Sequence, residues 1–65
     1  MRLKVNGKDI EFGGETLAEL LSEIGFTDGG FAAAVGTTII QRQDHNTHTL
    51  HEGDIITVIV ATHGG

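Results

Sequence analysis

The stretch Ile55-Ile56-Thr57-Val58-Ile59-Val60 lies close to the C-terminal end of a 65-residue chain and is almost entirely branched aliphatic. Isoleucine, valine and threonine favour β-strands. A strand with so few polar residues is typical of a central position in a sheet, where both faces are covered. We therefore expect residues 55–60 to be the central strand, around which the rest of the chain is arranged.

The N-terminal segment predicts a β-hairpin. Leu3 and Val5 precede the turn residues Asn6-Gly7, and Ile10 and Phe12 follow them. An Asn-Gly pair between two alternating segments is a strong signal for a tight hairpin turn. The residues that alternate with the apolar ones are charged: Arg2, Lys4, Asp9 and Glu11.

An amphipathic helix is expected at residues 17–24. Thr16 and Glu19 fit a capping box, in which each side chain accepts a hydrogen bond from the backbone N–H of the other. Gly25 follows at the position where a left-handed residue commonly ends a helix. The apolar positions fall at i, i+3, i+4 and i+7 and form one stripe: Leu17, Leu20, Leu21 and Ile24.

Short elements are expected between the helix and the last strand. Phe31–Val35 is predicted to be a short buried strand, because five residues flanked by glycines are too few to nucleate a helix. A turn then leads into a second short strand, Thr38–Ile40, which is expected to end near Gln41-Arg42. Residues 43–49 are polar and irregular, and residues 50–54 form a turn before the last strand.

The order of elements is therefore β-β-α-β-β-β. With the last strand central, it would lie parallel to the first strand, because a hairpin followed by a helix returns the chain to the sheet by a crossover. This predicts an α+β fold of the ubiquitin-like β-grasp type, with a mixed sheet of about five strands and one helix packed across one face. A ferredoxin-like fold would need a second helix, and the polar segment near residue 46 is a poor candidate.

Length and composition exclude several function classes. A chain of 65 residues makes one domain and has no room for a second lobe with a substrate cleft, so an independent enzyme is not expected. The formal charge of −5 and the lack of a cluster of Lys or Arg with aromatics disfavour nucleic acid. The chain has no cysteine and no apolar run of about 20 residues, so we expect a cytoplasmic protein without a membrane span.

The C-terminal end of the chain is Gly64-Gly65. We expect residues 1–60 to form the β-grasp domain and residues 61–65 to form a flexible tail that reaches at most about 16 Å when extended. Glycine has no side chain that would block entry into a narrow active site. The tail is therefore suited to presenting a terminal carboxylate to a partner.

Several short motifs follow one another along the chain: Val5-Asn6-Gly7, Leu17-x-x-Leu20-Leu21, Ala33-Ala34-Val35, Arg42, Leu50-x-x-Gly53-Asp54 and Gly64-Gly65. This order resembles the ThiS family of ubiquitin-like sulfur carriers, and the resemblance covers essentially the whole chain. The sequence departs from the family's pattern at Gln41, where the family often has proline, and at His45, where it often has tryptophan.

The resemblance implies a sulfur carrier of thiamine biosynthesis rather than an enzyme. In that family the terminal carboxylate, here that of Gly65, is adenylated by a ThiF-type partner enzyme that uses ATP. A sulfur donor protein then displaces AMP, and the resulting thiocarboxylate gives its sulfur to a ThiG-type thiazole synthase. Gly64 would keep the tail narrow, and Arg42 is a possible partner contact. The resemblance implies no cofactor, metal or catalytic residue on this chain itself.

Three alternative functions stay open. The small subunit of molybdopterin synthase uses the same thiocarboxylate chemistry but is usually longer. A ubiquitin-like modifier would attach Gly65 to lysines of target proteins, and a non-covalent binding module would not need the terminal glycines. The sequence also leaves open whether Ile55, Thr57 and Ile59, or the residues that alternate with them, face away from the helix.

The histidines suggest a metal site only weakly. His45, His48 and His51 stand three residues apart, and this spacing would align them only on a helix. Asn46 and Thr47 make a helix improbable there, so we expect these histidines to lie on the surface of a polar loop.

Overall fold

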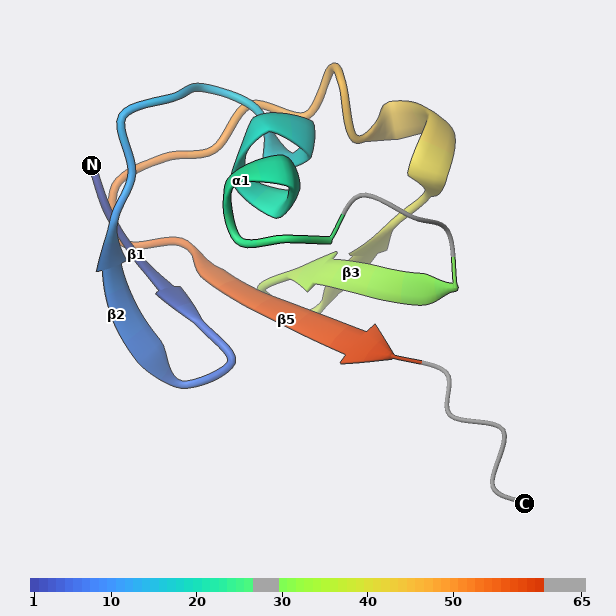
Figure 1. Ribbon diagram of the computed structural model, residues 1–65, viewed down its shortest axis with the longest axis horizontal. Helices are drawn as coiled ribbons and strands as arrows, with labels where there is room; N and C mark the ends of the chain where they lie inside the picture. Colours follow the sequence, from blue (N-terminus) through green and yellow to red (C-terminus); the bar gives the residue numbers. More distant parts are fainter. Residues whose placement is uncertain (27–29, 61–65) are drawn as a thin grey trace.

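The computed structural model describes residues 1–26 and 30–60 of the chain. In chain order the elements are β1 (Arg2–Val5), β2 (Lys8–Glu11), α1 (Leu17–Glu23), β3 (Phe31–Val35), β4 (Thr38–Ile40), the short 3₁₀ helix η1 (Arg42–Asp44) and β5 (Ile55–Val60). The strands form one sheet in the order β2-β1-β5-β3-β4, and α1 packs on one side of it (Figure 1). This is the ubiquitin-like β-grasp architecture expected from the sequence.

The central strand is β5, as predicted. It pairs in parallel with β1, where Lys4 lies opposite Ile55, and antiparallel with β3, where Ala33 lies opposite Val58. β5 therefore joins two antiparallel hairpins, β1–β2 and β3–β4, into a single mixed sheet.

The turn of the first hairpin has the geometry that its sequence demands. Asn6 and Gly7 have φ angles of 50° and 85°, and two consecutive positive φ angles are characteristic of a type I′ turn. Asparagine and glycine tolerate this left-handed region better than other residues. The twist of such a turn matches the twist of the flanking strands, which fixes the β1–β2 register.

The helix begins at the predicted capping box. The backbone N–H of Glu19 donates to the Thr16 hydroxyl at 3.3 Å, and the Thr16 N–H donates to the Glu19 carboxylate at 3.0 Å. Two further N–H groups of the first turn, those of Leu17 and Ala18, donate to backbone carbonyls of the loop that follows η1. The helix ends at Glu23, one residue earlier than expected, and Gly25 follows with a φ of 99°.

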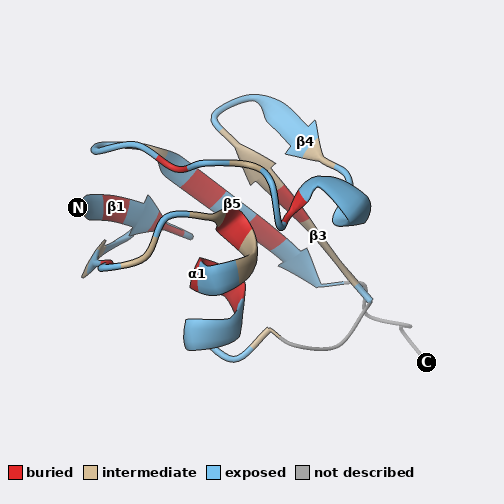
Figure 2. Cartoon of the chain, turned by 90° about the horizontal axis from the view of Figure 1, so that it is seen from above, coloured by how far each residue is buried: buried red, intermediate tan, exposed pale blue. Residues whose placement is uncertain are grey.

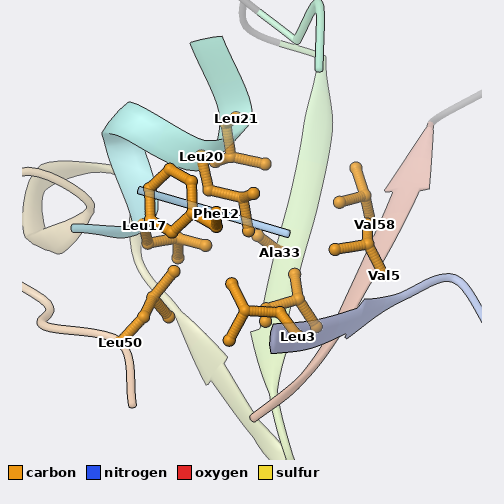
Figure 3. Packing of buried hydrophobic residues seen from close by; sticks show 10 residues of the cluster. Leu3, Val5, Phe12, Leu17, Leu20, Leu21, Ala33, Leu50 and Val58 are labelled. Carbon is orange, nitrogen blue, oxygen red and sulfur yellow. The ribbon is translucent and has the colours of Figure 1, made fainter. Parts of the chain in front are cut away.

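The core lies between α1 and the sheet. Leu17, Leu20 and Leu21 of the helix face side chains of the strands (Figure 3). Ile24 is only partly buried, but it packs against the same cluster. The remaining buried apolar residues come from strands and loops: Leu3, Val5, Phe12, Ala33, Leu50, Ile56 and Val58.

One expectation about β5 is wrong. The strand is central, but it is not covered on both faces: Ile56 and Val58 are buried, whereas Ile55, Thr57 and Ile59 are exposed. Figure 2 shows this as alternating red and pale blue bands along β5. The physical reason is that a chain this short places only α1 and its flanking loops against the sheet, and these lie on one side.

Candidate functional site

The face of the sheet opposite α1 is not covered by the helix (Figure 1). Cross-strand pairing places the residues that alternate with the core on this side. We call it the outer face. Its members are Arg2, Lys4, Asp9, Glu11, Ala32, Ala34, Ile39, Ile55, Thr57 and Ile59.

One half of the outer face is apolar. Ile39 of β4 is 67% exposed, and Ile55 and Ile59 of β5 are 53% and 56% exposed. Between them lie the small side chains of β3, because Ala34 pairs with Ile39 and Ala32 pairs with Ile59. Several large aliphatic side chains exposed together are typical of a surface that meets another protein.

The other half of the outer face, on β1 and β2, is charged. Arg2 lies opposite Glu11 and Lys4 lies opposite Asp9, so that each cation faces an acid on the neighbouring strand. The Arg2 guanidinium and the Glu11 carboxylate are 3.1 Å apart, but both side chains are strongly exposed. Such an exposed pair contributes little stability, and its charges remain accessible to a partner.

The sequence could have indicated which side of β5 is exposed. Thr57 is the one polar residue in the strand, and it lies on the outer face between Ile55 and Ile59. A single polar residue in a period-2 pattern favours exposure of the side on which it lies. In β5, however, one polar residue among five apolar ones is too weak a signal to decide which side faces solvent.

The strand β5 ends at Val60, which lies opposite Phe31 at the start of β3. The segment that follows, residues 61–65, lies outside the described residues. The proposed site residues Gly64 and Gly65 and the predicted flexible tail therefore stay predictions.

Arg42 lies at the same end of the sheet as Val60. β4 runs antiparallel to β3, and Ile40 pairs with Ala33, so the chain beyond Ile40 continues toward Phe31. The strand ends at Ile40, and Arg42 is the first residue of η1 rather than the end of a strand. It is exposed and lines a groove of about 400 Å³ together with Phe31. Among residues 1–26 and 30–60, the Arg2 guanidinium pairs with the Glu11 carboxylate, and Arg42 has no carboxylate partner.

The expectation of surface histidines is wrong for His45. Its side chain is buried, with 7% of its surface exposed, and Nε2 lies 3.1 Å from the backbone carbonyl of Ile40. Because a carbonyl oxygen can only accept, Nε2 carries the hydrogen and donates a hydrogen bond to the Ile40 carbonyl. The imidazole also stacks on Phe31, with ring centroids 6.1 Å apart and an angle of 21° between the planes.

The reason for this burial is the path of the loop after η1. The carbonyls of His45 and His48 accept hydrogen bonds from the N–H groups of Ala18 and Leu17, so the loop is held on the start of α1. The available signal was the tryptophan that the ThiS family often has at this position, which indicates a buried ring. His51, by contrast, is exposed as expected.

Within the described ranges, no group of three or more His, Cys, Asp or Glu side chains could hold a metal ion. The pKa of Glu19 lies below its ordinary value, because its carboxylate accepts hydrogen bonds from the backbone N–H groups of Thr16 and Glu15 and from the Thr16 hydroxyl. This shift belongs to the helix cap and does not indicate a catalytic acid. No helix in the described part of the chain is long and apolar enough to cross a membrane.

Comparison with known proteins points to one family. A family model described as the ThiS family matches residues 3–65. A crystal structure of the thiamine biosynthesis protein ThiS from Geobacter metallireducens is similar over 100% of both chains, with 25% sequence identity and a TM-score of 0.83. An NMR structure of a thiamine biosynthesis protein from the same organism has a TM-score of 0.79 and 23% identity, over 100% of this chain and 88% of that one. A search of curated protein sequences found no match.

Proposed function

The chain belongs to the ThiS family, and we propose from this that it is a sulfur carrier of thiamine biosynthesis, with the carboxylate of Gly65 as the atom group that carries the sulfur. The observation that carries the proposal is the family match over residues 3–65, which includes both terminal glycines.

The proposed reaction needs a partner enzyme, because a carboxylate is a poor electrophile. A ThiF-type enzyme that binds ATP transfers AMP to the Gly65 carboxylate and releases pyrophosphate. A sulfur donor protein then supplies sulfur at the oxidation level of sulfide, and attack of this sulfur on the carbonyl carbon displaces AMP and leaves a thiocarboxylate. A ThiG-type thiazole synthase takes the sulfur from it. ATP belongs to the partner in this scheme, and the carrier is a co-substrate rather than an enzyme.

The fold suits a carrier that presents its carboxylate while the partner enzyme performs the chemistry. The role of the carrier is to place one carboxylate in the active site of another protein, and positioning of a reacting group can supply much of the acceleration of a reaction. β5 pairs with β1 at Ile55 and Ile56 and with β3 as far as Val60, so β3 holds the end of the strand from which the tail departs. We propose that residues 1–60 act as a rigid domain and residues 61–65 as the flexible arm.

The outer face is the proposed docking surface for the partner. Its apolar half, with Ile39, Ile55 and Ile59, provides area that gains stability when it is covered. Its charged half provides Arg2 and Lys4 for orientation of the complex. Arg42, at the end of the sheet where β5 ends, is proposed as a further partner contact.

The test is top-down mass spectrometry of the protein purified without reducing treatment from cells grown with and without thiamine. We expect sulfur in place of one carboxylate oxygen at Gly65 when thiamine is absent. Fragments must locate the added mass, because oxidation of Met1 to the sulfoxide adds nearly the same mass at the other end of the chain. A plain carboxylate at Gly65 under both conditions would contradict the proposal.

A further inference from the structure

A groove lies between α1 and η1 on the helix side of the sheet, with a volume of about 400 Å³. It is separate from the outer face, which is on the opposite side. Its lining includes Leu21, Ser22, Phe26, Phe31, Arg42 and His45.

The floor of the groove is aromatic. The rings of Phe26 and Phe31 are 5.4 Å apart between centroids, with a tilt of 55°, and the imidazole of His45 stacks on Phe31 with the centroids 6.1 Å apart. Both phenylalanines are only partly buried. An aliphatic or aromatic side chain of another protein would find a preformed apolar contact here.

The charge at the edge of the groove is unusual for this chain. Three of its four Lys and Arg residues lie in the first hairpin, namely Arg2, Lys4 and Lys8, and Arg42 is the fourth. The formal charge of the chain is −5, so a carboxylate that approaches the remainder of the molecule meets mostly like charge. Arg42 is the one Lys or Arg side chain outside the first hairpin, and a guanidinium can bind a carboxylate through two parallel hydrogen bonds.

The groove is also close to the place where the tail departs. Phe31, on its floor, is the residue opposite Val60 in the sheet. A partner that draws Gly65 into its active site approaches the domain from this end. It can therefore reach the groove and the outer face at the same time.

We propose that the adenylating partner inserts an apolar side chain between Phe26 and Arg42, over the Phe31 ring, with an adjacent carboxylate bound to the Arg42 guanidinium. This inference rests on the proposed function and names the chemistry of the partner at a second contact surface. In the complex, the contacts on the outer face bury apolar area, and the charge pair in the groove orients the carrier on its partner.

The test is adenylation of the purified carrier by the adenylating enzyme of the same organism. The rate of ATP–pyrophosphate exchange measures this adenylation. We compare Arg42→Glu with Lys8→Glu, which makes the same change in net charge in the first hairpin. For Arg42→Glu we expect KM for the carrier to rise about tenfold or more, with kcat within about twofold of the wild type, because binding is lost and the chemical step is not. Lys8→Glu is expected to leave both values within about twofold.

A second pair of variants tests the apolar part of the groove. Ser22 is an exposed residue of α1 at its rim. Ser22→Tyr would fill the groove and is expected to raise KM by about tenfold, whereas Thr37→Tyr adds the same side chain at an exposed position outside the groove, in the turn between β3 and β4, and is expected to behave like the wild type.

The outcomes are distinguishable. Equal effects of Arg42→Glu and Lys8→Glu would show that only net charge matters, and an unchanged KM for Arg42→Glu and Ser22→Tyr would show that the groove is not covered; either result overturns the inference. Loss of thermal stability in Arg42→Glu would assign Arg42 to a contact within the chain, which also overturns it. If the wild-type carrier is not adenylated at all, the proposed function itself fails.

Discussion

The side-chain carbonyl of Asn6 accepts a hydrogen bond from the backbone N–H of Val58 at 2.8 Å. The backbone of β1 already bonds to β5 through the Asn6 N–H and the Ile56 carbonyl, 2.9 Å apart. Asn6 therefore extends the β1–β5 ladder by one further bond after its own backbone has turned away into the hairpin. One residue both forms the turn and ties it to the central strand.

Asn6→Ala is expected to reduce the free energy of unfolding by about 1–3 kcal/mol, because the Val58 N–H loses its acceptor in a partly buried place. Part of this loss comes from the φ of 50°, which alanine tolerates poorly. Asn6→Gly removes the acceptor without this strain, so the difference between the two variants in urea unfolding separates the two effects. Equal stability of Asn6→Ala and the wild type would contradict the role assigned to this bond.

Leu20→Ala is expected to destabilise the domain by about 2–5 kcal/mol, because Leu20 is fully buried and its truncation leaves a cavity between α1 and the sheet. Thermal or urea unfolding measures the change. Glu23→Ala, an exposed position on the same helix, is the control and is expected to change stability by less than about 0.5 kcal/mol.

The two sides of β5 can be compared with one chemical change. Ile59→Thr keeps a β-branched residue on the outer face and is expected to change the stability by less than about 0.5 kcal/mol, while it weakens partner binding because it removes exposed apolar area. Ile56→Thr places a hydroxyl in the core, where the wild-type residue is fully buried, and is expected to destabilise by about 1–3 kcal/mol. Unfolding curves and a binding titration with the partner enzyme distinguish them. Normal binding by Ile59→Thr would argue against the outer face as the docking surface.

The stability of the domain is expected to fall with acidification in part through Glu19. The pKa of this carboxyl is lowered in the folded state, first by the hydrogen bond from the Thr16 N–H and then by that from Glu15. A lowered folded-state pKa means that the contribution is present above the pKa of the unfolded chain and disappears as the pH falls through the folded-state value. Glu19→Gln should therefore be less stable than the wild type near neutral pH, and the difference should shrink in acid.

The control for this pH dependence is Ser22→Ala, a change between two uncharged side chains at an exposed position of the same helix. Its difference in stability from the wild type is expected to be the same at every pH. A constant difference between Glu19→Gln and the wild type from neutral to acidic pH would mean that the capping carboxylate does not contribute through its ionisation.

Addition of one residue after Gly65 is expected to abolish sulfur transfer without unfolding the domain, because the carboxylate would be displaced from the position at which the partner acts. Circular dichroism checks the fold, and thiocarboxylate formation by mass spectrometry checks the function. Sulfur transfer by the extended protein at the normal rate would contradict the role proposed for Gly65.

Local signals predicted most of the fold. The pair Asn6-Gly7 and the capping box of Thr16 and Glu19 each specify a backbone geometry through their own side chains, and the structure has both. The exposed side of β5 and the burial of His45 depend instead on which segments cover the sheet and on how the loop after η1 packs against α1. Such long-range packing leaves only a weak signal in the spacing of residues along the sequence, such as the single polar residue Thr57 in β5.

The position of β5 in the sheet also has a consequence for biogenesis. The two hairpins, β1–β2 and β3–β4, are neighbours only through β5, which is the last strand of the described chain. During synthesis, the ribosome must release residues 55–60 before either hairpin can join a common sheet, and contacts that link distant parts of a chain form slowly. A nascent chain stopped before residue 55 would hold two hairpins without the strand that joins them into one sheet, so the domain is complete only after β5 has been added.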